Sequence, residues 1–170
     1  PADLSAMLGV LRSTQNVGGI VVTIPHKVSC LAYCDQVSER AAFVGSVNII
    51  RKTAEGRWIG DNVDGIGYLD GMAQQGGQVE GKRFLLIGVG GAGAAVAFEV
   101  LQRGASYLAI HDLNTARRDA IIQSLATQFP NRVGVGSPDP SGFDVVANVT
   151  PVGMKAGDPY PVEVSKLKAD

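Results

Sequence analysis

The second half of the sequence alternates apolar and amphipathic segments, and this alternation restricts the fold more than any other feature. Strands are expected at residues 83–89, 106–112, 132–136 and 143–150, and helices at 93–104 and 114–129. Strands that alternate with helices predict a parallel sheet with helices on both faces. Sheets of this kind bind ligands at the carboxyl ends of their strands, where the loops lead into the helices.

The first part of the chain has a different succession of segments. Helices are expected within residues 1–15, with Asp3 as a candidate N-cap, and at 26–34 and 65–76, and strands at 18–24, 46–52 and 57–62. The stretch GGQVEGK at residues 76–82 is polar and rich in glycine, which is typical of a hinge between domains. We therefore expect one domain at residues 1–78 and a second at 79–170.

A glycine-rich turn follows the first strand of the second domain. In LLIGVGGAG, three glycines have the spacing GxGxxG, which permits a tight turn and lets backbone N–H groups approach a pyrophosphate. The chain has 22 glycines, so the spacing alone is a weak signal, but a strand before it and a helix after it are the context that this motif requires. The residues expected to bind a dinucleotide are Gly88, Val89, Gly90, Gly91, Ala92 and Gly93.

An acidic residue ends the next expected strand. Asp112 stands about 20 residues after the turn, where a carboxylate accepts hydrogen bonds from the adenosine ribose. Such a carboxylate repels a 2′-phosphate, so Asp112 predicts NAD in preference to NADP. Arg117 and Arg118 are expected to belong to the solvated face of the following helix. The alternative role for Asp112 is that of a helix N-cap.

Composition excludes several classes of protein. The chain is 45% hydrophobic and 18% charged with a net charge of -1, which is typical of a soluble globular protein and gives no basic surface for nucleic acid. Its apolar runs are shorter than the roughly 18 residues of a membrane span, and no signal segment opens it, so we expect no membrane partner and a cytoplasmic setting.

The cysteines and histidines have no spacing that indicates a metal or redox site. We expect structural roles and no metal for Cys30, Cys34, His26 and His111.

Five motifs together resemble the shikimate and quinate dehydrogenase family. In chain order they are VTIPHK, GSVNII, GDNVDGIGY, GVGGAGAA and NVTPVGM. The resemblance implies an α/β fold in which a smaller α/β substrate domain, here residues 1–78, precedes a Rossmann-type doubly wound parallel sheet. It also implies reversible hydride transfer between NAD(P) and a ring hydroxyl of shikimate, with NAD-dependent oxidation of quinate as the alternative.

The resemblance also implies roles for individual residues. Lys27 and Asp64 match the catalytic pair of the family, and Thr23 and Asn48 match residues that hydrogen-bond the ring hydroxyls. Thr150 resembles a threonine that contacts the cofactor. Oxidation of a secondary alcohol requires a group that takes the hydroxyl proton as hydride leaves. Two roles for Lys27 stay open, namely proton shuttle and cationic donor that stabilises developing oxyanion charge.

Three positions depart from the usual pattern of the family. Ile49 and Val63 stand where threonine is common, and Asp112 followed by Leu113 stands where NADP-using members carry asparagine followed by arginine. Loss of two hydroxyls near the expected substrate cleft favours quinate or another hydroxylated ring acid. All three departures favour an NAD-using relative.

Two expectations concern the protein as a whole. The family has a further amino-terminal strand and helix, with two serines that bind the substrate carboxylate, and a further carboxyl-terminal segment, so we expect this chain to be incomplete and weakly active or inactive alone. We expect a monomer or homodimer that binds a small molecule. The competing hypothesis is a module that senses a dinucleotide without catalysis, and the presence of Lys27 and Asp64 argues against it.

Overall fold

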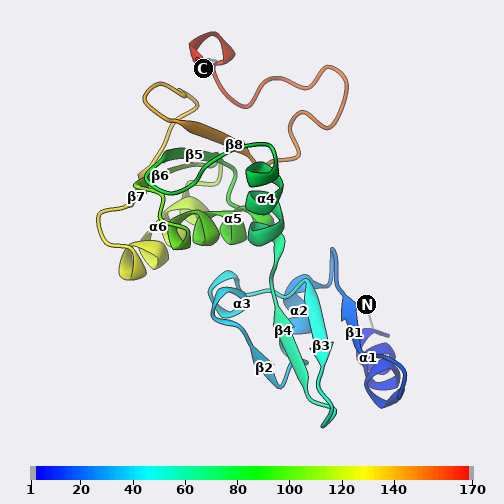
Figure 1. Ribbon diagram of the computed structural model, residues 1–170. Helices are drawn as coiled ribbons and strands as arrows, with labels where there is room; N and C mark the ends of the chain where they lie inside the picture. The colour runs from blue at the N-terminus through cyan, green and yellow to red at the C-terminus, as the bar shows by residue number, and fades with distance from the viewer. Residues whose placement is uncertain (1–2, 169–170) are drawn as a thin grey trace. The chain divides into compact units, whose positions relative to one another are not determined.

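The chain divides into two compact units between Val63 and Asp64. The computed structural model describes residues 3–168 (Figure 1). The division comes earlier than the expected boundary at residues 78 and 79, because helix α4 (Asp64–Gln74) packs along helix α5 (Gly91–Gln102) and so belongs to the second unit. Within the described residues, no helix has the length and apolar character that crossing a membrane requires.

The first unit is a small mixed sheet with three helices. Its elements are α1 (Leu4–Ser13), β1 (Gly19–Val21), α2 (Lys27–Leu31), β2 (Gln36–Val37), α3 (Glu39–Val44), β3 (Ile49–Lys52) and β4 (Trp58–Asp61). The strand order is β1-β3-β4-β2. Strand β3 is antiparallel to both of its neighbours, and β2 is parallel to β4.

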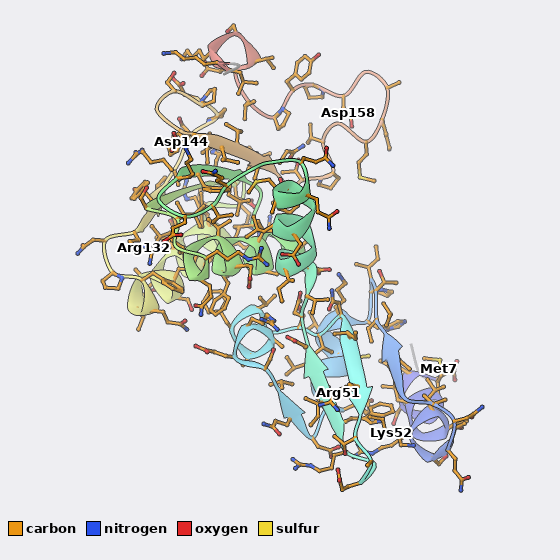
Figure 2. The ribbon with its side chains drawn as sticks, in the orientation of Figure 1. Met7, Arg51, Lys52, Arg132, Asp144 and Asp158 are labelled. Atoms are coloured by element: carbon orange, nitrogen blue, oxygen red, sulfur yellow. The ribbon has the colours of Figure 1, made fainter. Side chains whose placement is uncertain are left out.

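The core of the first unit joins α1 to the sheet. Leu4 and Leu8 are four residues apart on one face of α1, and both are buried with Ile50 and Trp58. The Nζ of Lys52, at the end of β3, donates to the backbone oxygens of Arg12 (2.7 Å) and Thr14 (3.0 Å). A cation at the carboxyl end of a helix satisfies carbonyls that have no intrahelical partner, so Lys52 fixes the end of α1 against the sheet (Figure 2).

Two short elements of this unit were not predicted. Strand β2 has two residues and helix α3 has six, which is too short for a periodic pattern of apolar residues. Two cap residues nevertheless mark α3 in the sequence. The side chain of Ser38 accepts a hydrogen bond from the Ala41 N–H, and Gly45 ends the helix in the left-handed conformation with φ of 70°.

The second unit contains the parallel sheet that the sequence predicts. Its further elements are β5 (Arg83–Ile87), β6 (Tyr107–His111), α6 (Thr115–Gln128), β7 (Val133–Val135), β8 (Val145–Asn148) and a 3-10 turn η1 (Val164–Lys166). All neighbouring strands are parallel, in the order β7-β6-β5-β8. The chain leaves β5 on one side to form β6 and β7 and then returns to its other side as β8, so the ends of β5 and β8 form a topological switch point.

The two faces of this sheet are covered differently in the described residues. Helices α5 and α6 lie on the same side of the sheet in Figure 1. On the other face, Leu85, Ile87 and Ala109 are buried against side chains that include Phe143 and Val162. The α/β fold class with a parallel sheet is confirmed. The sequence also predicted helices on both faces of the sheet, but within residues 3–168 α5 and α6 lie on one face (Figure 1) and loop side chains pack on the other.

Candidate functional site

The turn between β5 and α5 has two glycines that no other residue can replace without displacing its neighbours. Gly88 has φ of 91°, and a Cβ added there would lie 2.5 Å from Cγ2 of Thr150. A Cβ at Gly93 would lie 2.4 Å from the backbone oxygen of Gly88. At Gly90 and Gly91, by contrast, an added Cβ would meet no atom within 4 Å. Gly88 and Gly93 therefore allow the tight turn, and Gly90 and Gly91 leave open space in front of it.

Helix α5 starts at this open space without a side-chain cap. Its N-cap residue is Gly90, whose backbone oxygen accepts from the Ala94 N–H (2.8 Å). The first N–H groups of a helix have no intrahelical acceptor, and the helix dipole adds positive potential there. Because the turn combines these donors with open space, it fits the pyrophosphate of a dinucleotide.

The carboxylate of Asp112, which follows β6, forms its hydrogen bonds with other groups of the protein. Its side chain is only 5% exposed. It accepts hydrogen bonds from the N–H groups of Val89 (2.8 Å) and Asn114 (2.8 Å), and Nη2 of Arg117 lies 2.9 Å from both of its oxygens. Burial opposes ionisation of Asp112, but these hydrogen bonds outweigh it and hold its pKa below the usual value. Asp112 is therefore an ionised group that anchors the glycine-rich turn through Val89.

The N-cap of α6 is Asn114, whose Oδ1 accepts from the Arg117 N–H (3.0 Å). The alternative that Asp112 is the cap of this helix is therefore wrong. Arg117 was expected on a solvated face, but its half-exposed guanidinium pairs with the buried Asp112 carboxylate. Arg118 pairs with Asp119 instead, at 2.8 Å. The arginine nearest the end of β6 is thus part of the candidate site.

A polar loop lies at the end of β8, on the other side of the switch point. The hydroxyl of Thr150 donates to Oδ1 of Asn148 (2.7 Å) and accepts from the Val152 N–H (3.1 Å). Asn148 also donates from Nδ2 to the Val152 oxygen (2.9 Å). These bonds fix Thr150 next to Gly88, so the predicted cofactor residues Thr150 and Gly88 do meet. Asn148 was not predicted as a site residue, although it ends an apolar strand and begins the NVTPVGM motif.

In the first unit, backbone hydrogen bonds join the segments that carry three of the four predicted substrate residues, and the fourth, Asp64, belongs to the second unit. The Val22 N–H, next to Thr23, donates to the Asn48 oxygen (2.7 Å). The Val47 N–H, next to Asn48, donates to the Lys27 oxygen (3.0 Å). Three segments are therefore neighbours: the one after β1, which contains Thr23, the start of α2, which is Lys27, and the one before β3, which contains Asn48.

The two predicted catalytic residues both begin helices. Lys27 is the first residue of α2, after the cis peptide bond between Ile24 and Pro25, and Asp64 is the first residue of α4. A carboxylate in the first turn of a helix interacts favourably with the helix dipole. Neither Lys27 nor Asp64 is without an interaction partner, so neither is an isolated charge in solvent. His26, the N-cap residue of α2, makes no cap hydrogen bond through its side chain.

Comparison with known proteins identifies the family. Residues 1–50 match the family model described as the shikimate dehydrogenase substrate binding domain. The shikimate dehydrogenase (NADP(+)) of Methanococcus maripaludis is 35% identical over 142 residues, which cover 81% of this chain and 50% of that protein. The chain belongs to the shikimate dehydrogenase family. It spans about half the length of the curated relatives it matches.

Solved structures of shikimate dehydrogenase relatives share this fold. The 5-ketofructose reductase of Gluconobacter sp. strain CHM43 matches with a TM-score of 0.87 and 27% identity, over 98% of this chain and 61% of that one. Quinate dehydrogenase from Corynebacterium glutamicum, in complex with NAD, matches with a TM-score of 0.84 and 29% identity, over 97% of this chain and 60% of that one.

The predicted preference for NAD is wrong. Curated shikimate dehydrogenase relatives from Methanococcus maripaludis, Methanocaldococcus jannaschii and Lysinibacillus sphaericus are all named for NADP(+). The prediction assumed that the carboxylate of Asp112 faces the cofactor as an unpaired negative charge. In the structure that charge is neutralised by Arg117, whose guanidinium is 49% exposed. A neutralised carboxylate no longer repels a 2′-phosphate, which removes the physical basis of the prediction.

Proposed function

We propose that the protein to which this chain belongs is an NADP-dependent dehydrogenase that interconverts shikimate and 3-dehydroshikimate. The observation that supports the proposal is a pair of backbone hydrogen bonds, from Val22 to Asn48 and from Val47 to Lys27, which set the segments that carry Thr23, Lys27 and Asn48 beside one another. A hydroxyl, an ammonium and an amide on neighbouring segments are the kinds of group needed to recognise and deprotonate a ring bearing several hydroxyls. A module that only senses a dinucleotide has no need of them.

The cofactor site of the proposed enzyme is the switch point of the second unit. The turn at Gly90 and Gly91 offers N–H groups and space for the pyrophosphate, and Thr150 lies beside the turn. The exposed part of the Arg117 guanidinium supplies a donor for a 2′-phosphate. Asp112 serves this site by holding Val89 and Arg117 in place.

In the proposed reaction Lys27 exchanges a proton with the hydroxyl oxygen of the substrate. NADP, held at the glycine-rich turn, would supply the hydride chemistry at the carbon that bears this hydroxyl. Thr23 and Asn48 hydrogen-bond the ring hydroxyls, which fixes the orientation of the ring, and the carboxylate of Asp64 orients the reacting hydroxyl. If Lys27 acts as a cationic donor instead, it stabilises the developing negative charge on the same oxygen.

The test is oxidation of shikimate by the whole protein, followed through the absorbance of the reduced nicotinamide. We expect turnover with shikimate and NADP, and a loss of kcat of about 10²–10⁴-fold in Lys27→Ala with unchanged binding of NADP. Lys27→Arg distinguishes a proton shuttle from a cationic donor, because arginine keeps the positive charge but does not release a proton near neutral pH. Turnover should be lost in this variant if Lys27 is a proton shuttle, and kept in part if it is a cationic donor. If neither shikimate nor quinate is oxidised with NAD or with NADP, the proposal is contradicted and the module that only senses a dinucleotide is favoured.

A second candidate substrate is quinate. Ile49 and Val63 place apolar side chains where the family commonly has threonine, and the Ile49 side chain is exposed at the start of β3. Isoleucine and valine lack the threonine hydroxyl. A ring acid that needs a hydrogen bond from this hydroxyl would leave a polar group unsatisfied and would bind less well than one that does not need it. The ratio of kcat/KM for quinate to that for shikimate distinguishes the two candidates. A ratio above one would replace shikimate with quinate in the proposal.

The remaining properties of the proposed enzyme follow its class. We propose a cytoplasmic protein that acts as a monomer or homodimer on a small molecule. Light scattering of the purified whole protein would give its oligomeric state, and any larger assembly would contradict this part of the proposal.

A further inference from the structure

The carboxylate of Asp61, at the carboxyl end of β4, is the centre of a polar cluster in the first unit. Nε and Nη2 of Arg40 each lie 2.8 Å from one of its oxygens in a bidentate pair. Oδ1 also accepts from the Ser38 hydroxyl and from the Asn62 N–H (2.7 Å). Burial opposes ionisation of Asp61, but the hydrogen bonds from Arg40, Ser38 and Asn62 outweigh it and lower its pKa. Four residues, Ser38, Arg40, Asp61 and Asn62, form this Asp61 cluster.

The Asp61 cluster continues into the segment that contains Asn48. The backbone oxygen of Asp61 accepts from the Asn48 N–H (2.9 Å). Asn62 is 1% exposed, and its Nδ2 donates to Oγ of Ser46 (3.1 Å). The Val63 N–H donates to Oδ1 of Asn48 (2.9 Å). Each of the three consecutive residues from Asp61 to Val63 is therefore tied to residues 46–48.

These bonds affect one residue of the proposed site. The bond from Val63 orients the side-chain amide of Asn48, which the proposed function assigns to the ring hydroxyls. A bidentate arginine–carboxylate pair restrains both the distance and the plane of the carboxylate, which a single hydrogen bond does not.

We propose that Asp61 and Arg40 are positioning residues for the dehydrogenase reaction. They hold residues 61–63 so that the side-chain amide of Asn48 keeps the orientation that binding of the ring hydroxyls requires. This inference rests on the proposed function for its catalytic consequence. Its structural part, that the Asp61 cluster fixes residues 61–63, holds independently of any substrate.

The same unit contains a matched ion pair at the opposite end of β4. Arg12 pairs with Asp35, and Oδ2 of Asp35 accepts from the Trp58 N–H (2.6 Å) at the start of the strand. The side chains of Asp35 and Asp61 are 31% and 26% exposed. Asp35→Asn therefore removes the same charge from a similar environment without touching residues 61–63, and is the control for Asp61→Asn.

The experiment compares the two variants in the whole protein by hydrogen–deuterium exchange and by kinetics. In Asp61→Asn we expect the amides of residues 62–64 to exchange about tenfold faster or more, and kcat/KM for shikimate to fall about tenfold or more. We expect KM for NADP to stay within about twofold. In Asp35→Asn we expect the exchange of residues 62–64 and all kinetic constants to stay within about twofold of the wild type. This holds even if the melting temperature falls as much as in Asp61→Asn.

The outcomes separate the inference from the proposed function. Unchanged exchange at residues 62–64 in Asp61→Asn, or equal kinetic effects of the two variants, would overturn the inference. If the wild-type protein does not turn over shikimate, the proposed function fails, and the exchange data alone decide whether the cluster fixes residues 61–63. If Asp61→Asn does not fold, Arg40→Lys serves in its place, because lysine keeps the charge and loses the bidentate geometry.

Discussion

The carboxylate of Asp112 accepts a hydrogen bond of 2.8 Å from the backbone N–H of Val89. This bond ties the end of β6 to the glycine-rich turn after β5. Val89 is itself buried, with 1% of its surface exposed, so the bond anchors the turn from the protein side. The residue that the sequence assigns to cofactor choice therefore also holds the glycine-rich turn in place.

Removing this acceptor should weaken both the fold and the cofactor site. Asp112→Ala leaves the Val89 N–H and the Arg117 guanidinium without their partner, so we expect a loss of about 1–3 kcal/mol in the free energy of unfolding, measured with urea. Binding of NADP should weaken in parallel. Asp119→Ala, which breaks the exposed pair with Arg118, is the control and should stay within about 0.5 kcal/mol. Equal losses in the two variants would show that Asp112 has no special role.

The lowered pKa of Asp112 predicts how stability depends on pH. In the unfolded chain its pKa is about 3.9, and in the folded protein it is lower. The unfolded state therefore binds the proton first, and the stabilisation is present at higher pH and is lost as the pH falls through the folded pKa. Urea unfolding from pH 7 downward should show a steeper loss below about pH 4 in the wild type than in Asp112→Asn. If the free energy of unfolding depends on pH in the same way in both proteins, Asp112 does not have a lowered pKa in the folded state.

Arg117 should determine the preference between the two cofactors. Its guanidinium is the cation beside the end of β6, and a charge-assisted hydrogen bond to a phosphate contributes about 1.5–3 kcal/mol. Arg117→Ala should raise KM for NADP by about tenfold or more and leave KM for NAD within about twofold. Arg118→Ala, whose guanidinium pairs with Asp119, is the control. If both cofactors weaken equally in Arg117→Ala, Arg117 only supports Asp112.

The glycines of the turn should separate into two classes. Gly93→Ala places a Cβ 2.4 Å from the Gly88 oxygen, so overpacking should cost about 1–3 kcal/mol of stability. Gly91→Ala meets no atom within 4 Å and should leave the melting temperature of the protein unchanged. The added methyl should nevertheless weaken NADP binding, because it occupies the space in front of the helix terminus. If Gly91→Ala binds NADP normally, the pyrophosphate does not lie at this turn.

Sequence patterns predicted the long elements of this fold because burial imposes a period on them. The alternation from residue 83 onward predicted the order of β5, α5, β6 and α6, and the glycine spacing predicted where the turn lies. Short elements have no measurable period, so β2 and α3 were missed although Ser38 and Gly45 mark the ends of α3. Cap residues carry information that periodicity does not.

Hydrogen bonds between groups far apart in the sequence were beyond the reach of sequence patterns. The Asp112 carboxylate and the Val89 N–H are 23 residues apart, and Asp61 and Arg40 are 21 apart, with no local rule that pairs them. The NAD prediction failed for a different reason, since it treated the Asp112 carboxylate as unpaired although its partner is close in the sequence. An arginine five residues later reaches back over the helix start, and only the folded geometry shows it.

The packing of α4 on α5 predicts opposite effects for two glycines of the same helix. A Cβ at Gly65 would lie 2.3 Å from the Ala95 oxygen, whereas at Gly67 it would meet no atom within 4 Å. Gly67→Ala should therefore stabilise the protein by up to about 1 kcal/mol through helix propensity. Gly65→Ala should destabilise it by about 1–3 kcal/mol, because the backbones of α4 and α5 must move apart. Since Gly65 follows Asp64, we also expect a lower kcat in Gly65→Ala and an unchanged kcat in Gly67→Ala. Equal melting temperatures would mean that the close approach of the two helices does not contribute to the stability of the second unit.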